Sequence, residues 1–227
     1  MSYLFGGDGR YVAKYDDKSD LVYVLEGLRL TLKPEVVQQA TANRSPAMIG
    51  GFKVLLAIHE PHLRDIAATV HSEVGVAHDQ SEAEGIARVI RNRAEYKKVS
   101  LDSARLFGNV GGSSMYGRTT ANYRTAKGLP IERWTGNLKS DLEGTVRGLA
   151  GTADVTNGAY FWDATRDVLK PTHQWVRNQW IGGKDPHYQG ASIEGDYTPL
   201  WIWKADLGET SFFAYNPSGK QPKNVWP

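Results

Sequence analysis

Three acidic residues lie close together where one predicted helix gives way to the next. Glu73 ends an amphipathic stretch, Asp79 lies in the connection, and Glu82 falls in the first turn of the second helix. The negative end of a helix dipole disfavours an ionised carboxylate at position 73, whereas the positive end favours one at position 82. Two carboxylates in opposed environments suit the division between a general acid and a base or electrostatic stabiliser, which glycosidases use.

The same acidic residues also have a structural explanation. A glutamate in the first turn of a helix is ordinary helix-start chemistry, which applies to Glu82 and still more to Glu84. Asp79 could take the second catalytic role in place of Glu82. On the residues alone, the identity of the second carboxylate stays open.

Hydrophobic periodicity predicts the elements that must position these residues. Helices are expected over 62–73, over 81–95 with Ser81 and Glu84 as a capping box, and over 138–149 before Gly151. Two further helices are expected earlier in the chain, over 34–40 and over the apolar run 46–57. Strands are expected over 11–15, 21–25, 201–203 and 211–215, and a glycine-rich loop or short hairpin over 107–121.

These elements predict an α+β fold that is mainly α. We expect a β/α extension over 1–58 that packs on the core, a helical core over 59–170, and a Trp-rich extension over 171–227 in the same globule. The 227 residues suit this arrangement, and 41% hydrophobic against 23% charged residues predicts a folded core.

Charge and composition argue against several classes of protein. A net charge of +2 without a basic cluster does not indicate nucleic-acid binding, and no apolar run is long enough to span a bilayer. The absence of cysteine excludes disulfides and thiol catalysis. The first residues lack the pattern of a signal peptide.

No cofactor and no metal site is expected. The run His59-Glu60-Pro61-His62 is not the H-E-x-x-H motif, and the spacing of His71 and His78 around Glu73 fits no zinc template. No phosphate-binding or dinucleotide fingerprint occurs in a strand–turn–helix context, and no G-x-S-x-G elbow occurs, although a Ser–His–Asp site stays open.

Three segments together resemble the SleB-type cell-wall hydrolase family. They are 70–75 around Glu73, 82–94 with the pair Asn92-Arg93, and the Gly-Ala-aromatic-aromatic segment within 156–162. The resemblance covers about residues 62–168. It implies a lysozyme-like helical fold that cleaves the glycan backbone of peptidoglycan between N-acetylmuramic acid and N-acetylglucosamine, with Glu73 as the acid.

The chain departs from the family pattern in two places. Val74 follows the acid where the family prefers alanine, and the loop is one residue longer, with His78-Asp79 in place of Gly-Glu. Both Glu82 and Asp79 therefore stay open as the second carboxylate.

A glycan substrate suggests further binding residues. Aromatic side chains stack on sugar faces, so Tyr116, Tyr160 and Trp162 are candidates, and Ser114 and Asp79 could hold polar groups of the sugar. Each also has a plain explanation, since aromatic residues build cores and glycine-rich loops are often simple connectors.

The chain also resembles the lysozyme domains of type VI secretion effectors, since it lacks cysteine and a signal peptide and has β-rich ends. This resemblance implies synthesis in the cytoplasm, action at the cell wall in the periplasm of a target cell, a secretion carrier and an immunity protein. We expect a monomer.

Three alternatives stay open. In a lytic transglycosylase the 6-hydroxyl of the muramoyl sugar replaces water, and one acid suffices. A non-catalytic glycan-binding or delivery module would use the aromatic residues alone. A structural adaptor of a larger toxin would contact a carrier through 171–227.

Overall fold

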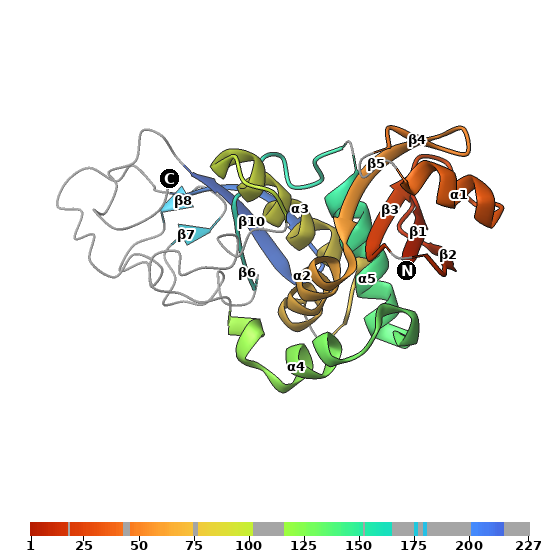
Figure 1. Cartoon of the computed structure of the whole chain (residues 1–227). Helices are drawn as coiled ribbons and strands as arrows, with labels where there is room; N and C mark the ends of the chain where they lie inside the picture. The colour runs from red at the N-terminus through yellow and green to blue at the C-terminus, as the bar shows by residue number, and fades with distance from the viewer. Residues whose placement is uncertain are drawn as a thin grey trace.

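The computed structural model describes residues 1–17, 19–42, 46–74, 77–101, 116–151, 153–164, 175–176, 179–180 and 201–215 (Figure 1). A curled five-stranded sheet forms the N-terminal part, with the order β2-β1-β3-β5-β4. Its strands are β1 (Ser2–Gly6), β2 (Tyr11–Tyr15), β3 (Leu21–Leu25), β4 (Met48–Ile49) and β5 (Phe52–His59). β1 and β3 run parallel, and the other neighbours run antiparallel.

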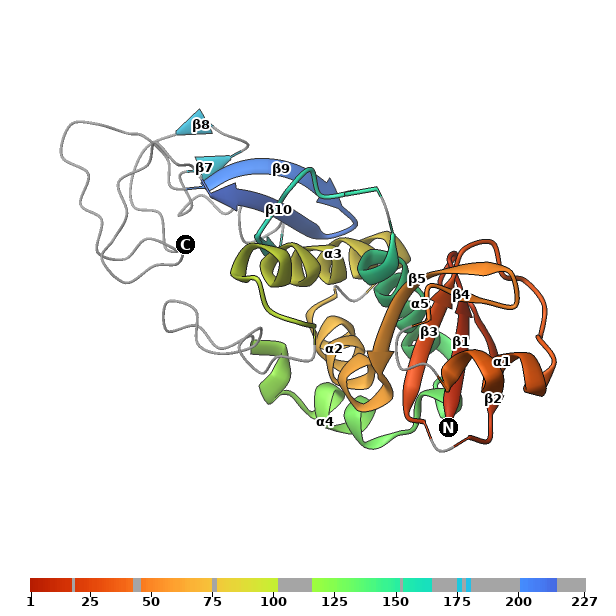
Figure 2. The ribbon, with the colours of Figure 1, turned by 45° about the horizontal axis from the view of Figure 1, so that its top comes forward.

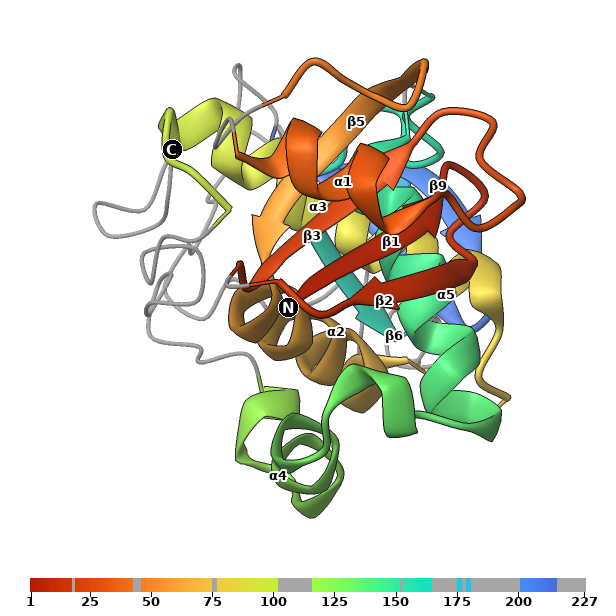
Figure 3. The ribbon, with the colours of Figure 1, turned by 45° about the vertical axis from the view of Figure 1, so that its right-hand side comes forward.

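Both faces of this sheet are covered. Leu4, Tyr23 and Leu25 pack with Val37 of helix α1 (Pro34–Thr41), which lies across one face (Figure 3). The alternate residues Phe5 and the β3 valines pack against the helical layer on the other face. Side chains of successive strand residues point to opposite faces, so a strand buried on both sides is apolar throughout.

The apolar run 46–57 is a strand hairpin, and the expectation of a helix there is wrong. Gly50 and Gly51 have φ values of 58° and 86°, and they join β4 to β5. Only glycine adopts these angles at little cost, so the pair closes a tight turn. A short apolar run has no periodicity that separates a buried helix from a buried strand.

The three helices expected from periodicity are present as α2 (Glu60–Glu73), α3 (Gln80–Lys97) and α5 (Gly136–Ala150). The structure adds α4 (Ala121–Gly128), which was not expected, and the 3-10 turns η2 (Tyr116–Thr119) and η3 (Ile131–Arg133). α3 and α5 pack closely because two glycines face α3: a Cβ on Gly148 would lie 2.3 Å from the Glu84 carbonyl oxygen, and one on Gly144 2.7 Å from that of Gln80. The Arg147 Nε donates to the Glu84 carboxylate at 2.9 Å across the same contact.

The C-terminal strands pack on α3. β6 (Phe161–Ala164), β9 (Trp201–Leu207) and β10 (Thr210–Tyr215) form a three-stranded antiparallel sheet in the order β6-β10-β9, and β7 (Trp175–Val176) pairs with β8 (Gln179–Trp180). Figure 2 shows the β9–β10 hairpin on the side of α3 away from α2. A Cβ on Gly85 would lie 2.6 Å from the Phe212 ring, so the hairpin sits directly against α3.

One hydrophobic cluster joins all three parts of the chain. It contains Phe5 and Val24 from the sheet, Ile66 and Ile90 from the helices, and Phe212 from β10. The expectation of a mainly helical fold with small β-rich extensions is therefore wrong. The fold is α+β, because the N-terminal strands build one wall of the main core and are not a small addition to a helical domain. No helix in the described ranges has both the length and the hydrophobicity to cross a bilayer.

Candidate active site

Glu73 is the last residue of α2, as the sequence predicted, and it is half-buried. The helix ends there because Val74 takes an extended conformation (φ −65°, ψ 148°). The first turn of this helix contains Pro61, which is tolerated because the first amide groups of a helix have no intrahelical partner. Glu73 therefore projects from a helix C-terminus, where the carbonyl groups carry a partial negative charge.

Arg93 of α3 carries a positive charge that interacts electrostatically with Glu73. Its side chain is only 7% exposed. Burial lowers the pKa of the guanidinium to about 10, and the negative charge of Glu73 acts in the opposite direction. A buried cation is stable only with compensating partners, so the proximity of the two charges is part of what holds Arg93 in place.

Arg93 also contacts the segment that carries the predicted aromatic residues. Its Nε donates to the Tyr160 carbonyl oxygen at 2.7 Å, and its guanidinium carbon lies 4.7 Å from the centre of the Trp162 ring. This is the geometry of a cation–π contact. One arginine thus contacts the start of β6 and interacts electrostatically with Glu73 at the end of α2.

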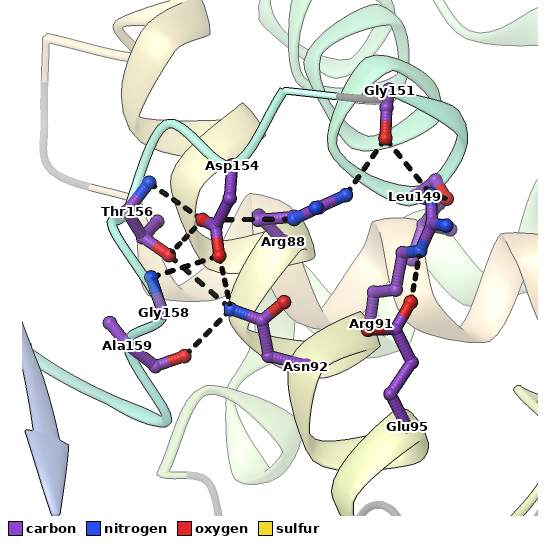
Figure 4. A network of polar contacts seen from close by, with 10 residues as sticks. All are labelled: Arg88, Arg91, Asn92, Glu95, Leu149, Gly151, Asp154, Thr156, Gly158 and Ala159. Carbon is purple, nitrogen blue, oxygen red and sulfur yellow. Dashed lines mark hydrogen bonds and ion pairs between the residues drawn. The ribbon is translucent and has the colours of Figure 1, made fainter.

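Asn92, the neighbour of Arg93, holds the turn before β6 (Figure 4). Its Nδ2 donates to the Ala159 carbonyl oxygen at 2.9 Å and to the Asp154 carboxylate at 3.0 Å. The turn itself has Asn157 and Gly158 at φ 53° and 80°, as its Asn-Gly sequence indicates.

Asp154 is the centre of this turn. It accepts from the Thr156 amide and hydroxyl at 2.9 and 2.7 Å and from the Gly158 amide at 2.9 Å. Burial raises the pKa of the Asp154 carboxyl, but the hydrogen bonds from Thr156, Asn92 and Gly158 outweigh it and hold the pKa below its ordinary value. The ionised carboxylate therefore stabilises the turn.

The predicted aromatic residues Tyr160 and Trp162 are both partly exposed. A third aromatic residue, Tyr96, lies edge-on to Tyr160 with 5.5 Å between ring centres and is 50% exposed. The sequence interpretation missed Tyr96 and gave Arg93 no role. Their spacing of three positions on one helix was the available signal, since such residues share a face.

Glu82 does not lie beside Arg93. It is eleven positions earlier on α3, which corresponds to ~16 Å along the helix axis. It is 1% exposed, its Oε1 accepts from the Thr210 hydroxyl, and its Oε2 lies 3.0 Å from where a Cβ of Gly208 would be. The turn between β9 and β10 therefore covers this carboxylate.

Asp79 caps α3. Its carboxylate accepts from the amide and the hydroxyl of Ser81, both at 2.8 Å, so the cap is Asp79 and not the predicted Ser81–Glu84 box. Glu84 instead pairs with Arg147.

Two further candidates fall wholly or partly beyond the described residues. Ser114 lies outside them. Tyr116 begins η2, but its side chain is not described. η2 lies against α2, because Arg118 donates to Asp65 at 2.9 Å and to the Thr69 hydroxyl at 3.0 Å.

A second polar cluster lies close to Glu73 in the sequence. His71 of α2 and His78 of the following connection both contact Asp141 of α5. Together they could bind a metal ion. The sequence interpretation considered both histidines but had no signal for Asp141, which is 63 positions from the nearer one.

Comparison of the chain with protein-family models, with curated proteins and with solved structures gave no match. The resemblance described above therefore depends on its short motifs.

Proposed function

We propose that this protein is a glycosidase that cleaves the glycan backbone of peptidoglycan, with Glu73 as the proton donor. The observation that carries the proposal is the position of one buried arginine, which contacts the segment of Tyr160 and Trp162 and is close enough to Glu73 to interact with its charge. Arg93 interacts electrostatically with Glu73, donates a hydrogen bond to the Tyr160 carbonyl oxygen and lies over the ring of Trp162. An acid at a helix end beside exposed aromatic surface suits cleavage of a sugar polymer.

The placement of the other carboxylates favours a mechanism that needs one acid. Asp79 is occupied as a helix cap, and Glu82 is enclosed under the β9–β10 turn. Within the glycosidase proposal we therefore favour the lytic transglycosylase reaction over hydrolysis by two carboxylates.

In that reaction Glu73 gives its proton to the oxygen of the glycosidic bond as the bond to C1 of the muramoyl sugar breaks. The 6-hydroxyl of the same sugar then attacks C1, and its proton returns to Glu73. The products are an anhydro sugar end and a free 4-hydroxyl. The positive charge of Arg93 stabilises the carboxylate that exists between the two proton transfers.

The resemblance to type VI effector domains extends the proposal to biology. The enzyme would act at the cell wall of a target cell after delivery by a carrier, and the producing cell would need an immunity protein.

The test is mass spectrometry of the soluble products released from purified sacculi. Wild type is compared with Glu73→Gln, Glu82→Gln and the control Glu95→Gln, which changes a carboxylate that is 58% exposed on the same helix as Glu82. We expect anhydro muropeptides from wild type, a loss of about 100-fold or more with Glu73→Gln, and near-normal release from the other two.

Other outcomes separate the alternatives. Reducing products that disappear with both Glu73→Gln and Glu82→Gln would indicate a two-carboxylate lysozyme. No product, with sacculi that still pellet the protein, would refute the enzyme and leave a glycan-binding module. No product and no pelleting would favour an adaptor.

A further inference from the structure

Three polar residues from separate parts of the chain meet behind Glu73. His71 is in the last turn of α2, His78 precedes α3, and Asp141 is in the first half of α5. His71 and Glu73 are two positions apart on one helix, which turns their side chains by about 200° relative to each other. The cluster therefore faces away from the side on which Glu73 projects.

The three side chains converge on a single point. The Nδ1 atoms of His71 and His78 lie 2.6 and 2.9 Å from the same oxygen of Asp141, Oδ2. The two rings are stacked, with 5.0 Å between their centres and 17° between their planes. One ligand atom from each residue lies within 4.8 Å of the other two.

Asp141 is fully buried, at 0% exposure. Its second oxygen, Oδ1, has no hydrogen-bond partner among the described residues. Among the described residues, the ion-pair partners of Asp141 are the two histidines, and no lysine or arginine contacts it. A buried carboxylate is costly unless a cation and hydrogen bonds compensate it, and in the described part of the chain this one has no permanently charged partner.

The two histidines make the cluster accessible from solvent. The side chains of His71 and His78 are 12% and 18% exposed, so the cluster lies at the edge of the core. An ion could reach it, and water could complete the coordination. Two imidazoles and one carboxylate are the ligand set that Zn²⁺ and related ions take in sites that keep a position for water.

We propose that His71, His78 and Asp141 form a binding site for a divalent transition-metal ion of the zinc type. Ligands of one zinc ion at 2.0–2.1 Å lie ~3.3 Å apart, so each Nδ1 must move away from Oδ2 by roughly half an ångström. A metal ion bound there would link the end of α2 and the connection between α2 and α3 to α5. Its existence does not depend on the glycosidase proposal.

The test is a metal titration of tag-free protein after treatment with a chelator. Isothermal titration with Zn²⁺ measures affinity and stoichiometry, and the visible absorption of added Co²⁺ reports nitrogen and oxygen ligands. We expect one site per chain in wild type. His78→Ala should weaken it at least about 100-fold, since even residues that only support metal ligands give losses of 10–100-fold. Zn²⁺ should also raise the melting temperature of wild type and not that of His78→Ala.

The matched control is His59→Ala. His59 Nδ1 contacts Asp20 Oδ1 at 2.7 Å, but this pair is exposed and is not part of a three-residue cluster in the described chain. This variant should bind Zn²⁺ as wild type does. Asp141→Asn provides a second loss-of-ligand variant, and circular dichroism of both metal-free variants verifies their fold. No saturable binding, or equal binding by wild type and both ligand variants, would overturn the proposal.

Discussion

Asn92 and Arg93, adjacent on α3, donate to two adjacent carbonyl groups, those of Ala159 and Tyr160, at 2.9 and 2.7 Å. The two side chains thus fix the backbone just before β6 against the helix. Because β6 carries Trp162, this pairing sets where the aromatic surface lies relative to Glu73. The Asn-Arg pair therefore positions the site, and no contact of either residue with a substrate needs to be assumed.

The buried amide of Asn92 should contribute strongly to stability. Asn92→Ala leaves the Ala159 carbonyl without this donor and should lower the free energy of unfolding by about 2 kcal/mol, measured by urea denaturation. Asn122→Ala, which changes an exposed residue of α4, is the control and should have little effect. Equal stability of the two variants would show that the contact is dispensable.

Arg93→Lys should separate charge from geometry. Lysine keeps the positive charge beside Glu73 but loses the planar group that reaches Tyr160 and Trp162 together. We expect the rate of product release from sacculi to fall by about ten-fold or more. The near-ultraviolet circular dichroism should change as well, because the ring of Trp162 loses its partner. Arg124→Lys, at an exposed position of α4, should change neither quantity.

Asp154 should make the free energy of unfolding depend on pH in the acidic range. Its pKa is lowered in the folded protein, so its contribution is complete above its ordinary value of 3.8 and is lost as the pH falls through the lower folded value. Asp154→Asn should cost about 1–3 kcal/mol near pH 7, and the difference from wild type should shrink below about pH 3. Unfolding by urea at several pH values measures this. A gap that stays constant with pH would contradict the assignment, and Asp16→Asn is the exposed control.

Glu60 should behave in the opposite way. Burial raises the pKa of its carboxyl despite the opposing effect of Arg64, so the ionised form is penalised at neutral pH. The penalty shrinks as the pH falls below the folded value and is gone below the ordinary value of 4.5. Glu60→Gln should raise the melting temperature near pH 7 and have less effect near pH 4. Glu35→Gln, in the exposed first turn of α1, should not stabilise at either pH. A destabilised Glu60→Gln variant would refute the argument.

The close contact of α3 and α5 predicts a difference between two glycines. A methyl group on Gly148 meets the Glu84 carbonyl, so Gly148→Ala should destabilise by about 1–3 kcal/mol. A methyl group on Gly128, in the last turn of α4, meets nothing within 4 Å. Gly128→Ala should be neutral or slightly stabilising. Thermal unfolding of both variants measures the contrast.

The sequence predicted the elements that have a strong period and missed those that do not. The helices that carry Glu73 and Arg93 follow from apolar residues at helical spacing, and both are confirmed. The run 46–57 has no such period, and the hairpin it forms depends on two glycines whose turn was not recognised. That error hid two of the five strands of the N-terminal sheet and contributed to the mainly helical expectation.

The polar contacts of the site could be predicted only in part. The position of Glu73 at a helix end follows from the sequence, but the contact of Arg93 with Trp162 spans 69 positions and depends on how β6 packs. Likewise, the contact of His71 with Asp141 spans 70 positions. Glu82 resembles a catalytic carboxylate in sequence, and only the β9–β10 turn reveals that it is covered.

The contact between Phe212 and Gly85 also determines when the core can fold during synthesis on the ribosome. The ring of Phe212 is fully buried against α3, inside the same cluster as residues of β1 and α2. The ribosome therefore has to release the chain through Phe212 before this core can close. Until then the part of α3 around Gly85 lacks the apolar cover that the Phe212 ring provides, and exposed apolar surface in an incompletely folded chain favours aggregation.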